Sequence, residues 1–579
     1  MAWHIGNTTV RTPYRLIGAL EHLPNSKFNG ALSGKEDEAE FALFLDELGL
    51  VSTNPNGNYT DLLGRKWRSA LYQLGFITPL LSSRWPSGKI DPKLKPVTDL
   101  VDGLTGRQYE VTPSGLRLGK SKNILEQQDC FLRTLAAYQC PSIVEKGQGQ
   151  PFSPLKHSIR ILLELERRIG SSRVSFEEFA LVVQNSTSAE DIVTICDRLI
   201  TLRSDRASAA RNVAAFDRSA YADASAVQGV LPETLRDYAD LSMRYLKATG
   251  IFQSAGRGIS LSPGRRLLAE LLAAETAVIS DPATYLVRLW RGADLPTDNL
   301  VESMAIVEDL RARLEQRGVA TATLPATTDQ KQIDTYRFGL ETQLRYLDEQ
   351  EYADQQKDQF DEITCWLSAL ASGRKVTGPA GQFIMVPKGE APAYLEWALW
   401  RAFLAINGLV NKPWEARRFQ IDQDFLPVGC APGGGPDAFF EFDDNVIVLE
   451  ATLSDSSRQE AMEGEPVRRH VADFEKRYDG TGKKVYGLFV ARNINSNTAH
   501  TFRMGEWYLP DDSDIYLDIV PVRLDQLIAI FQARLTSPGT VRVSLLQLLS
   551  KARQLATRPA PKWKTLIAEI VEQLNQDPA

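Results

Sequence analysis

Short apolar segments alternate with helical patterns over residues 386–579, and this alternation constrains the fold more than any other feature of the sequence. The segments at 446–453 and 484–491 are rich in β-branched and aromatic residues and have the length of buried strands. A helical pattern at 458–478 separates them, and a third extended segment follows at 515–520. Strands that alternate with helices predict an α/β domain with a central mixed sheet.

The chain has 579 residues, which is too long for one hydrophobic core, because such cores stop growing at roughly 250–300 residues. We therefore expect a multidomain α+β protein. Residues 1–150 and 151–290 each show a helix followed by a glycine-bounded pair of extended segments, the order found in winged-helix DNA-binding modules. An ordinary α+β lobe would show the same pattern. Residues 291–385 carry long charged helical stretches and are expected to form a helical linker to the domain at 386–579.

The net charge of the chain is −7, which argues against a protein that coats nucleic acid indiscriminately. The segment 61–122, however, holds 11 basic and 5 acidic residues, a local charge of +6. A basic stripe in a mildly acidic chain suits a selective DNA reader. A solvated lysine-rich face would give the same count.

We expect a cytoplasmic protein. The sequence contains no apolar run of the length needed to span a bilayer, and its first residues lack the charged-then-apolar pattern of an export signal. The five cysteines are scattered, and no pair has the spacing of zinc ligands. Reduced thiols in a cytoplasmic environment account for them.

The sequence GGGPDAFFEFDDNVIVLEATLS places two acids at the ends of neighbouring segments. Asp437 follows a Gly-Pro turn and leads into a strand, while Glu450 lies near the end of the next, strongly apolar strand. A buried glutamate is costly unless it binds a cation or a hydrogen-bond donor. Two strands of a hairpin can bring both acids together as an oxygen site for Mg²⁺, which activates water and neutralises charge on a scissile phosphate. The alternative is a turn aspartate and a surface glutamate at a strand end.

This arrangement resembles the PD-(D/E)xK nuclease superfamily. The resemblance implies that Asp437, Glu450 and the carbonyl oxygen of Ala451 hold the metal. Thr452 stands where most members have lysine, which leaves open the group that orients the attacking water.

Two further acids and a histidine lie on helical segments near this motif. Glu396 occurs in YLEWALWRAFLAINGL, whose other face is apolar, and Glu463 and His470 share one face of the helix after the Glu450 strand. We expect the acids to join the site, although a solvated helix surface is the commoner position of a glutamate. For His470 an orienting or structural function is favoured over a catalytic one.

The chain as a whole resembles the AlwI-like type IIS restriction endonucleases, which include the large subunits of heterodimeric nicking endonucleases. The resemblance rests on an ordered set of segments: FSPLKHSIRILLELE, RYLKATGIF, YLEWALWRAF, LPVGCAPGGGPDAFFEF, VIVLEATLS, EGEPVRRH and YGLFVARNINSNT. It implies two winged-helix-like recognition lobes, a helical linker and a C-terminal PD-(D/E)xK domain. It also implies that the active-site carboxylates are Glu396, Asp437, Glu450 and Glu463, that Glu-x-Thr and hence Thr452 is a family trait, and that His470 matches a histidine after the Glu-Pro-Val motif. These six residues are the candidates for the catalytic site.

The resemblance gives Arg65 a counterpart in the first recognition module. Charge and placement predict further DNA contacts at Lys66, Arg68, Arg117, Arg244, Lys247 and Arg257. Some of these side chains would contact phosphate only, which positions a protein without reading sequence.

These features predict a Mg²⁺-dependent restriction endonuclease that hydrolyses DNA phosphodiester bonds a few bases outside a short asymmetric site and leaves 5′-phosphates. One such domain cuts one strand, so double-strand cleavage needs a second copy or a small catalytic subunit, and nicking results without either. A cognate DNA methyltransferase is expected in the same system. The alternative is a winged-helix DNA-binding regulator whose nuclease fold no longer cuts.

Overall fold

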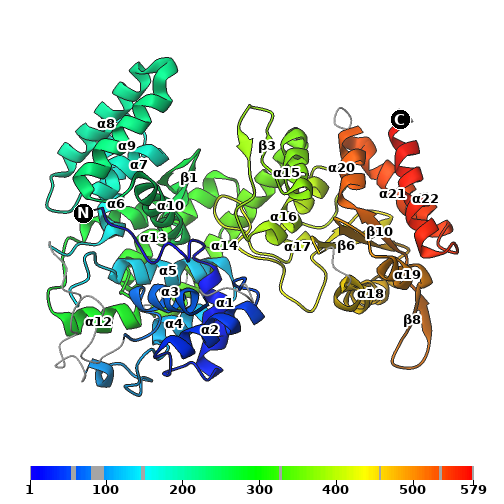
Figure 1. The fold of residues 1–579 in the computed structure, drawn as a ribbon, viewed down its shortest axis with the longest axis horizontal. Coiled ribbons are helices and arrows are strands. Elements are labelled where there is room, and N and C mark those ends of the chain that lie inside the picture. Colours follow the sequence, from blue (N-terminus) through cyan, green and yellow to red (C-terminus); the bar gives the residue numbers. More distant parts are fainter. Residues whose placement is uncertain are drawn as a thin grey trace. The chain divides into compact units, whose positions relative to one another are not determined.

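The chain forms two compact units, Met1–Glu341 and Thr342–Ala579, in a computed structural model (Figure 1). The structure describes residues 2–53, 60–79, 97–144, 150–324, 329–454, 458–533 and 538–576. Within these ranges no helix is both long and apolar enough to cross a membrane. The fold is α+β and multidomain, as predicted; the four-part division of the chain stays a prediction.

Unit 1 consists mainly of helices. They are α1 (Arg15–His22), α2 (Lys35–Glu47), α3 (Thr60–Gln73), α4 (Pro113–Lys120), α5 (Ile124–Ala137), α6 (Pro154–Ile169), α7 (Phe176–Leu181), α8 (Ile192–Ser208), α9 (Val213–Gln228), α10 (Pro232–Ala248), α11 (Arg266–Ala274), α12 (Pro282–Arg291) and α13 (Leu300–Gln316). The next helix, α14 (Gln330–Gln355), begins in unit 1 and ends in unit 2.

Local sequence signals set several of these helix starts. Ser175 caps α7 by accepting a hydrogen bond from the backbone of Glu178, whose side chain in turn accepts from the Ser175 backbone, as the sequence predicts. Ser153 caps α6 by accepting a hydrogen bond from the backbone N–H of Lys156, and Pro154 occupies its first position, where no N–H is needed.

Unit 1 contains one β-hairpin among its described residues. Strands β1 (Phe252–Ala255) and β2 (Gly258–Leu261) pair antiparallel around a turn in which Gly256 has φ +63°, which confirms the predicted hairpin. Of the extended segments expected in residues 1–150, the one at 106–113 does not form a strand, because among the described residues only an isolated bridge between Ile77 and Val111 forms there. Tyr109, with φ +58°, interrupts the extended backbone. The Pro/Ser/Gly-rich connection before it includes residues 80–96, which lie outside the described residues.

Unit 2 combines helices with a four-stranded sheet. Its helices after α14 are α15 (Phe360–Ser372), α16 (Ala391–Leu404), α17 (Pro413–Ala416), α18 (Gln459–Tyr478), α19 (Ser496–Met504), α20 (Leu524–Ala533), α21 (Pro538–Gln554) and α22 (Ala560–Gln576). Its strands are β3 (Val376–Thr377), β4 (Phe383–Ile384), β5 (Ala438–Glu441), β6 (Asn445–Thr452), β7 (Lys484–Ala491), β8 (Glu506–Tyr508), β9 (Asp514–Tyr516) and β10 (Ile519–Arg523).

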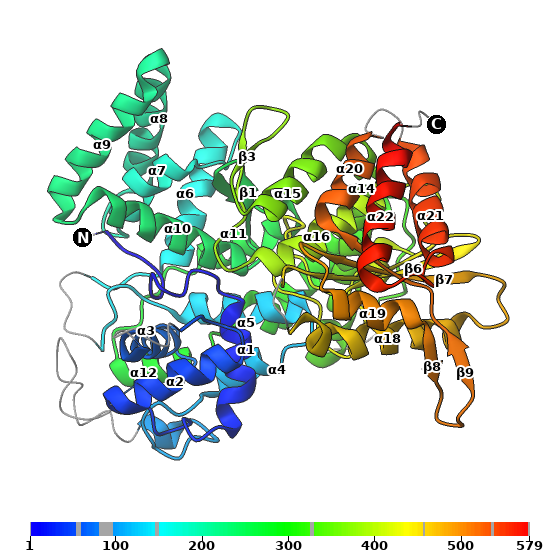
Figure 2. The ribbon, with the colours of Figure 1, turned by 45° about the vertical axis from the view of Figure 1, so that its right-hand side comes forward.

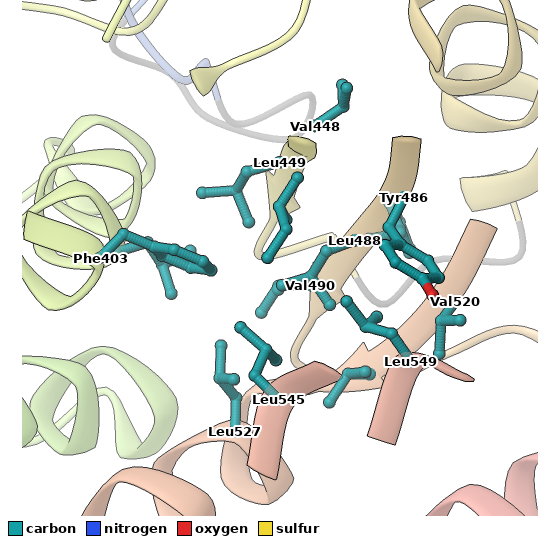
Figure 3. Close-up of a cluster of buried hydrophobic side chains, with 14 of the residues drawn as sticks. Phe403, Val448, Leu449, Tyr486, Leu488, Val490, Val520, Leu527, Leu545 and Leu549 are labelled. Atoms are coloured by element: carbon teal, nitrogen blue, oxygen red, sulfur yellow. The ribbon is translucent and has the colours of Figure 1, made fainter. Parts of the chain in front are cut away.

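The main sheet has the order β10-β7-β6-β5, with β5 antiparallel to β6 and the other pairs parallel, which confirms the predicted mixed sheet. Helices cover both faces, so the central strands are apolar on both sides. On one face Phe403 of α16, Leu527 of α20 and Leu549 of α21 pack on Leu488 and Val490 (Figure 3). Helices α18 and α19 cover the other face (Figures 1 and 2).

One predicted strand of this unit divides in two. The expected strand at 515–520 is split, because Leu517 donates its backbone N–H to Gly505 instead of continuing one ladder. Strand β9 pairs with β8 in a separate hairpin, and β10 joins the main sheet.

The end of α14 belongs to the core of unit 2. Glu349 is fully buried and forms two hydrogen bonds with Arg417, of 2.7 and 2.8 Å. One turn further on, the ring of Tyr352 stacks on Phe425 with centroids 4.4 Å apart. Helices fill most of 291–372, as the sequence predicts, and the part after Glu341 packs into unit 2.

Candidate active site

Strand pairing brings Asp437 and Glu450 together. Ala438 of β5 lies opposite Leu449 of β6, so the preceding Asp437 and the following Glu450 are neighbours across the hairpin. The backbone N–H of Ala451 donates to Oδ2 of Asp437 at 2.7 Å. The two acids thus lie at the carboxyl end of β6, the edge of a parallel sheet at which ligands usually bind.

His470 fixes the side chain of Glu450 from α18. Its Nδ1 lies 2.6 Å from Oε1 of Glu450, and both residues are buried. Within the described part of the chain, Nε2 of His470 is buried and has no hydrogen-bond partner. A histidine ring in such a contact can hold a carboxylate in place, and the orienting function of His470 stays a prediction.

Glu463 and Thr452 form a second pair. Glu463 lies on α18 two turns before His470; burial raises its pKa, and the neighbouring Thr452 hydroxyl acts in the opposite direction. The residue in the usual lysine position of the motif therefore contacts an acid of the site.

Glu396 approaches from α16. Its Oε2 accepts a hydrogen bond of 2.7 Å from the backbone N–H of Ala431, in the loop that leads to Asp437. Two other side chains of α16 tie the helix to its surroundings: Trp397 donates to the carbonyl of Phe425 at 2.7 Å, and buried Arg401 donates to Gln356 and Gln359, between α14 and α15.

The four acids have raised pKa values, and for three of them the charge of another of the four is one of the causes. Burial, and then the charge of Asp437, raise the pKa of Glu396 to about 9. Burial, and then the charge of Glu450, raise the pKa of Asp437 to about 8. Burial, and then the charge of Glu463, raise the pKa of Glu450 to about 8, and burial also raises the pKa of Glu463. Like charges that cannot all ionise together need a compensating cation.

A divalent cation fits this donor set. In the described ranges, no three His, Cys, Asp or Glu side chains are arranged so that they could hold a metal ion as they stand. Mg²⁺ needs fewer protein ligands, because one or two carboxylates suffice when water and substrate phosphates complete its shell. Asp437 and Glu450 provide two such carboxylates, and among the described residues no lysine or arginine forms an ion pair with either.

Arg418 is a site residue for which the sequence carries no direct signal. Its Nη1 donates to the carbonyl of Pro436 at 3.2 Å and its Nη2 to that of Gly433 at 3.3 Å. Its positive charge lowers the pKa of both Asp437 and Glu450 and so offsets part of the electrostatic repulsion between the two carboxylates. The only hint is the run of glycines, since a Cβ on Gly435 would lie 2.5 Å from the guanidinium.

The candidate DNA-contact residues of the first half of unit 1 differ in their accessibility. Arg65 on α3 and Arg117 on α4 are exposed, and Lys66 is half-buried. Arg68 is mostly buried, 2.5 Å from Glu38 in an ion pair. Its guanidinium is thus occupied within the unit.

The remaining candidates lie on α10 and the β1–β2 hairpin. Arg244 and Lys247 are half-buried and bond to Asp240 and Ser254. Arg257 lies beside the turn of the hairpin with 81% of its side chain exposed. The structure contains no DNA, so these contacts stay predictions.

Comparisons with known proteins identify the family. The structure is similar to that of the small subunit of the heterodimeric restriction endonuclease R.BspD6I, at 21% identity over 36% of this chain and 96% of that one, with a TM-score of 0.27. It is also similar to restriction endonuclease FokI, at 9% identity over 93% of this chain and 96% of that one, with a TM-score of 0.23. TM-scores this low establish no shared arrangement. No curated protein matches the chain.

The sequence model of the AlwI restriction endonuclease family, in contrast, matches residues 72–530, which is most of the chain and includes all four acids of the site. The chain therefore belongs to the AlwI restriction endonuclease family and is a type II site-specific deoxyribonuclease.

Proposed function

We propose that unit 2 is the cleavage domain of a Mg²⁺-dependent type IIS restriction endonuclease, which hydrolyses DNA a few bases outside a short asymmetric site. The observation that carries this proposal is the group of four acids with raised pKa values, Glu396, Asp437, Glu450 and Glu463, around the carboxyl end of β6. Perturbed carboxyl groups of this kind gather at catalytic sites.

Asp437, Glu450 and the Ala451 carbonyl would hold the metal. A bound Mg²⁺ supplies positive charge beside the scissile phosphate and makes a neighbouring water more acidic. The chain keeps the ligands in place: the Ala451 N–H positions Asp437, and His470 positions Glu450. Glu396, held by the loop before Asp437, completes the shell or a second site.

Glu463 is our candidate for the group that takes the proton from the attacking water. Burial raises its pKa, which makes it a better proton acceptor than an ordinary carboxylate, and the Thr452 hydroxyl lies beside it. As the water oxygen bonds to phosphorus, the bond from phosphorus to the 3′ oxygen breaks. The products are a 5′-phosphate and a 3′-hydroxyl.

Unit 1 would recognise the asymmetric site through two winged-helix-like subdomains, 1–150 and 151–290. Arg257, exposed beside the hairpin turn, is the best placed candidate to enter a groove. Arg65, Lys66, Arg117, Arg244 and Lys247 would contribute further contacts, whereas Arg68 stabilises the unit through Glu38.

Each chain would cut one strand, because it carries one site of this kind in its described residues. Double-strand cleavage then needs a second copy or a small catalytic subunit, and nicking is the outcome without either. A cognate DNA methyltransferase in the same system would protect the site on the host DNA.

The test is plasmid cleavage. Wild type, Glu450→Ala and the control Glu465→Ala are incubated with supercoiled plasmid, with and without Mg²⁺. Glu465 is an exposed acid of α18, paired with Arg469 and outside the site. We expect cleavage by wild type and the control in Mg²⁺, and none by Glu450→Ala.

Two outcomes would contradict the proposal. Metal-dependent cutting by Glu450→Ala would show that Glu450 is not needed for cleavage and that the proposed site is not the catalytic one. Specific DNA binding by the wild type without cutting in any divalent metal would indicate a regulator. Sequencing the cut ends gives the recognition sequence, the cut positions and the number of strands cut.

A further inference from the structure

A small β-hairpin precedes the helix that carries Glu396. Strands β3 and β4 pair antiparallel, with Val376 opposite Ile384 and Thr377 opposite Phe383. Gly381, with φ +78°, closes the turn by donating its N–H to the carbonyl of Gly378. The hairpin projects from the body of unit 2 (Figures 1 and 2).

The hairpin is anchored at its base. Ile384 is buried, and the thiol of Cys365 on α15 contacts the carbonyl of Thr377 at 3.7 Å. One side of this two-stranded ribbon is thus fixed on unit 2, and the other is presented to solvent.

The presented side is apolar and basic. Phe383 and Met385 are each 67% exposed, and Nζ of Lys375 lies 4.5 Å from the centroid of the Phe383 ring. Arg374 and Lys388 are also exposed. The segment 374–388 holds these three cations and no Asp or Glu.

This local charge opposes that of the rest of the unit. Residues 342–579 hold 26 Lys+Arg and 33 Asp+Glu, a net charge of 26 − 33 = −7. An acidic unit that must approach a polyanion needs a local basic surface.

We infer that the β3–β4 hairpin is a DNA-contacting element of the cleavage unit, in which Arg374, Lys375 and Lys388 bind backbone phosphates and Phe383 and Met385 contact the groove beside the cut. Charge complementarity selects DNA as the occupant, because the three cations face solvent without a neighbouring acid in the segment. A two-stranded ribbon has the width of a major groove, and apolar side chains enter grooves in many DNA-binding proteins.

Chain connectivity keeps the hairpin near the proposed catalytic centre. Six residues lie between Ile384 and Ala391, where α16 begins, and the seven Cα–Cα steps between the two span at most about 25 Å. Glu396 lies a further ~8 Å along the helix. The hairpin is therefore within about one turn of B-form DNA, roughly 34 Å, of Glu396. This step rests on the proposed function, because it takes the Glu396 site as the nuclease centre.

The test removes the charges and compares two triple variants of the full-length protein. One carries Arg374→Gln, Lys375→Gln and Lys388→Gln. The control removes three exposed cations from the C-terminal helical region, with the substitutions Lys551→Gln, Arg558→Gln and Lys562→Gln. Binding of a duplex that contains the mapped site is measured in Ca²⁺, in place of Mg²⁺, over a range of salt concentrations.

We expect the slope of log K against log salt to fall in magnitude by about 0.9 for each phosphate contact that the hairpin variant loses. Hydroxyl-radical footprinting should show that protection near the cut position is lost while protection of the recognition sequence stays. Phe383→Ala with Met385→Ala should weaken binding without changing the slope. The control triple variant should match wild type in all three measurements.

An unchanged slope and an unchanged footprint in the hairpin variant would overturn the inference. If Phe383→Ala with Met385→Ala altered only self-association in sedimentation, the face would be a protein interface and the inference would again be wrong. Wild-type protein that binds its site without cutting would contradict the proposed function instead, so the two failures are distinguishable.

Discussion

Asp437 and Glu450 keep their protons at a pH at which carboxyl groups in water have lost them, because burial and neighbouring acids raise the pKa of each to about 8. Their ordinary values are 3.8 and 4.5. Between these values and about 8, the folded chain binds more protons than the unfolded chain. Without metal, its stability therefore falls as the pH rises through this window, and the loss is complete above it.

Neutral replacements should remove this cost. We expect Asp437→Asn and Glu450→Gln to raise the free energy of unfolding of unit 2 at pH 8.5 in EDTA by on the order of 1–3 kcal/mol, and to abolish cleavage. At about pH 3, below the ordinary pKa of both groups, most of the gain should be gone, because the wild-type carboxyls are then largely protonated in both states. Calorimetric melting at the two pH values measures both effects.

Glu465→Gln, on the exposed face of α18, is the control and should melt as wild type does. If an amide variant were less stable than wild type at both pH values, the hydrogen bonds of the acids would contribute more stability than their burial costs. The prediction would then be wrong.

Arg418 is another single residue on which the site depends, because it donates hydrogen bonds to two carbonyls of the loop before Asp437. Arg418→Gln should lower kcat by about 100-fold, because a shift of the loop by an ångström misplaces Asp437. Binding of DNA in Ca²⁺ should stay within about twofold of wild type. Arg418→Lys should recover part of the rate, since it keeps the charge but loses the fork that reaches two carbonyls.

Arg469→Gln removes a charge that Glu450 also senses, yet Arg469 is paired with exposed Glu465 and does not contact the loop. It should retain most of the activity. Equal losses of DNA affinity and of kcat in Arg418→Gln would mean that Arg418 contacts DNA and does not position the loop.

At the scale of elements, the pair Glu349–Arg417 joins α14 to the strand segment that carries Arg418. Glu349→Gln leaves Arg417 with a buried, unbalanced charge, and we expect unit 2 to lose about 3–5 kcal/mol of stability. The double replacement Glu349→Met with Arg417→Met should recover most of this loss, because well-packed apolar side chains substitute for buried ion pairs. Urea unfolding of the variants tests both statements.

Elements whose signals are local could be predicted from the sequence. The bounds of α6 and β7, the capping box at Ser175 and the register that joins Asp437 to Glu450 follow from periodicity, caps and turns. What depends on tertiary contacts could not be predicted. No periodic pattern in the sequence indicates the positive φ of Tyr109 or the break of the expected strand at Leu517. The same is true of the hydrogen bond from Arg418 to a loop residue 18 positions further along the chain.

At the scale of the whole molecule, one proposed site per chain sets the order of strand cleavage. We expect nicked circles to accumulate first at equimolar enzyme and plasmid. Linear DNA should then appear with a steeper than first-order dependence on enzyme concentration, because a second catalytic domain must arrive. Gel analysis of time courses at several enzyme concentrations measures this order.

A first-order rise of linear DNA without a nicked intermediate would contradict this expectation. A plasmid that stays nicked at all concentrations would indicate that the second catalytic domain belongs to a different polypeptide.

The repulsion among the buried acids has a consequence for inheritance. Many single substitutions of Asp437 or Glu450 would yield a more stable protein that no longer cuts DNA. Random mutation at these positions therefore tends to produce inactive proteins. Only an advantage conferred by cleavage opposes that drift. Lineages in which the advantage lapses should therefore shed these two acids early, while the fold around them persists.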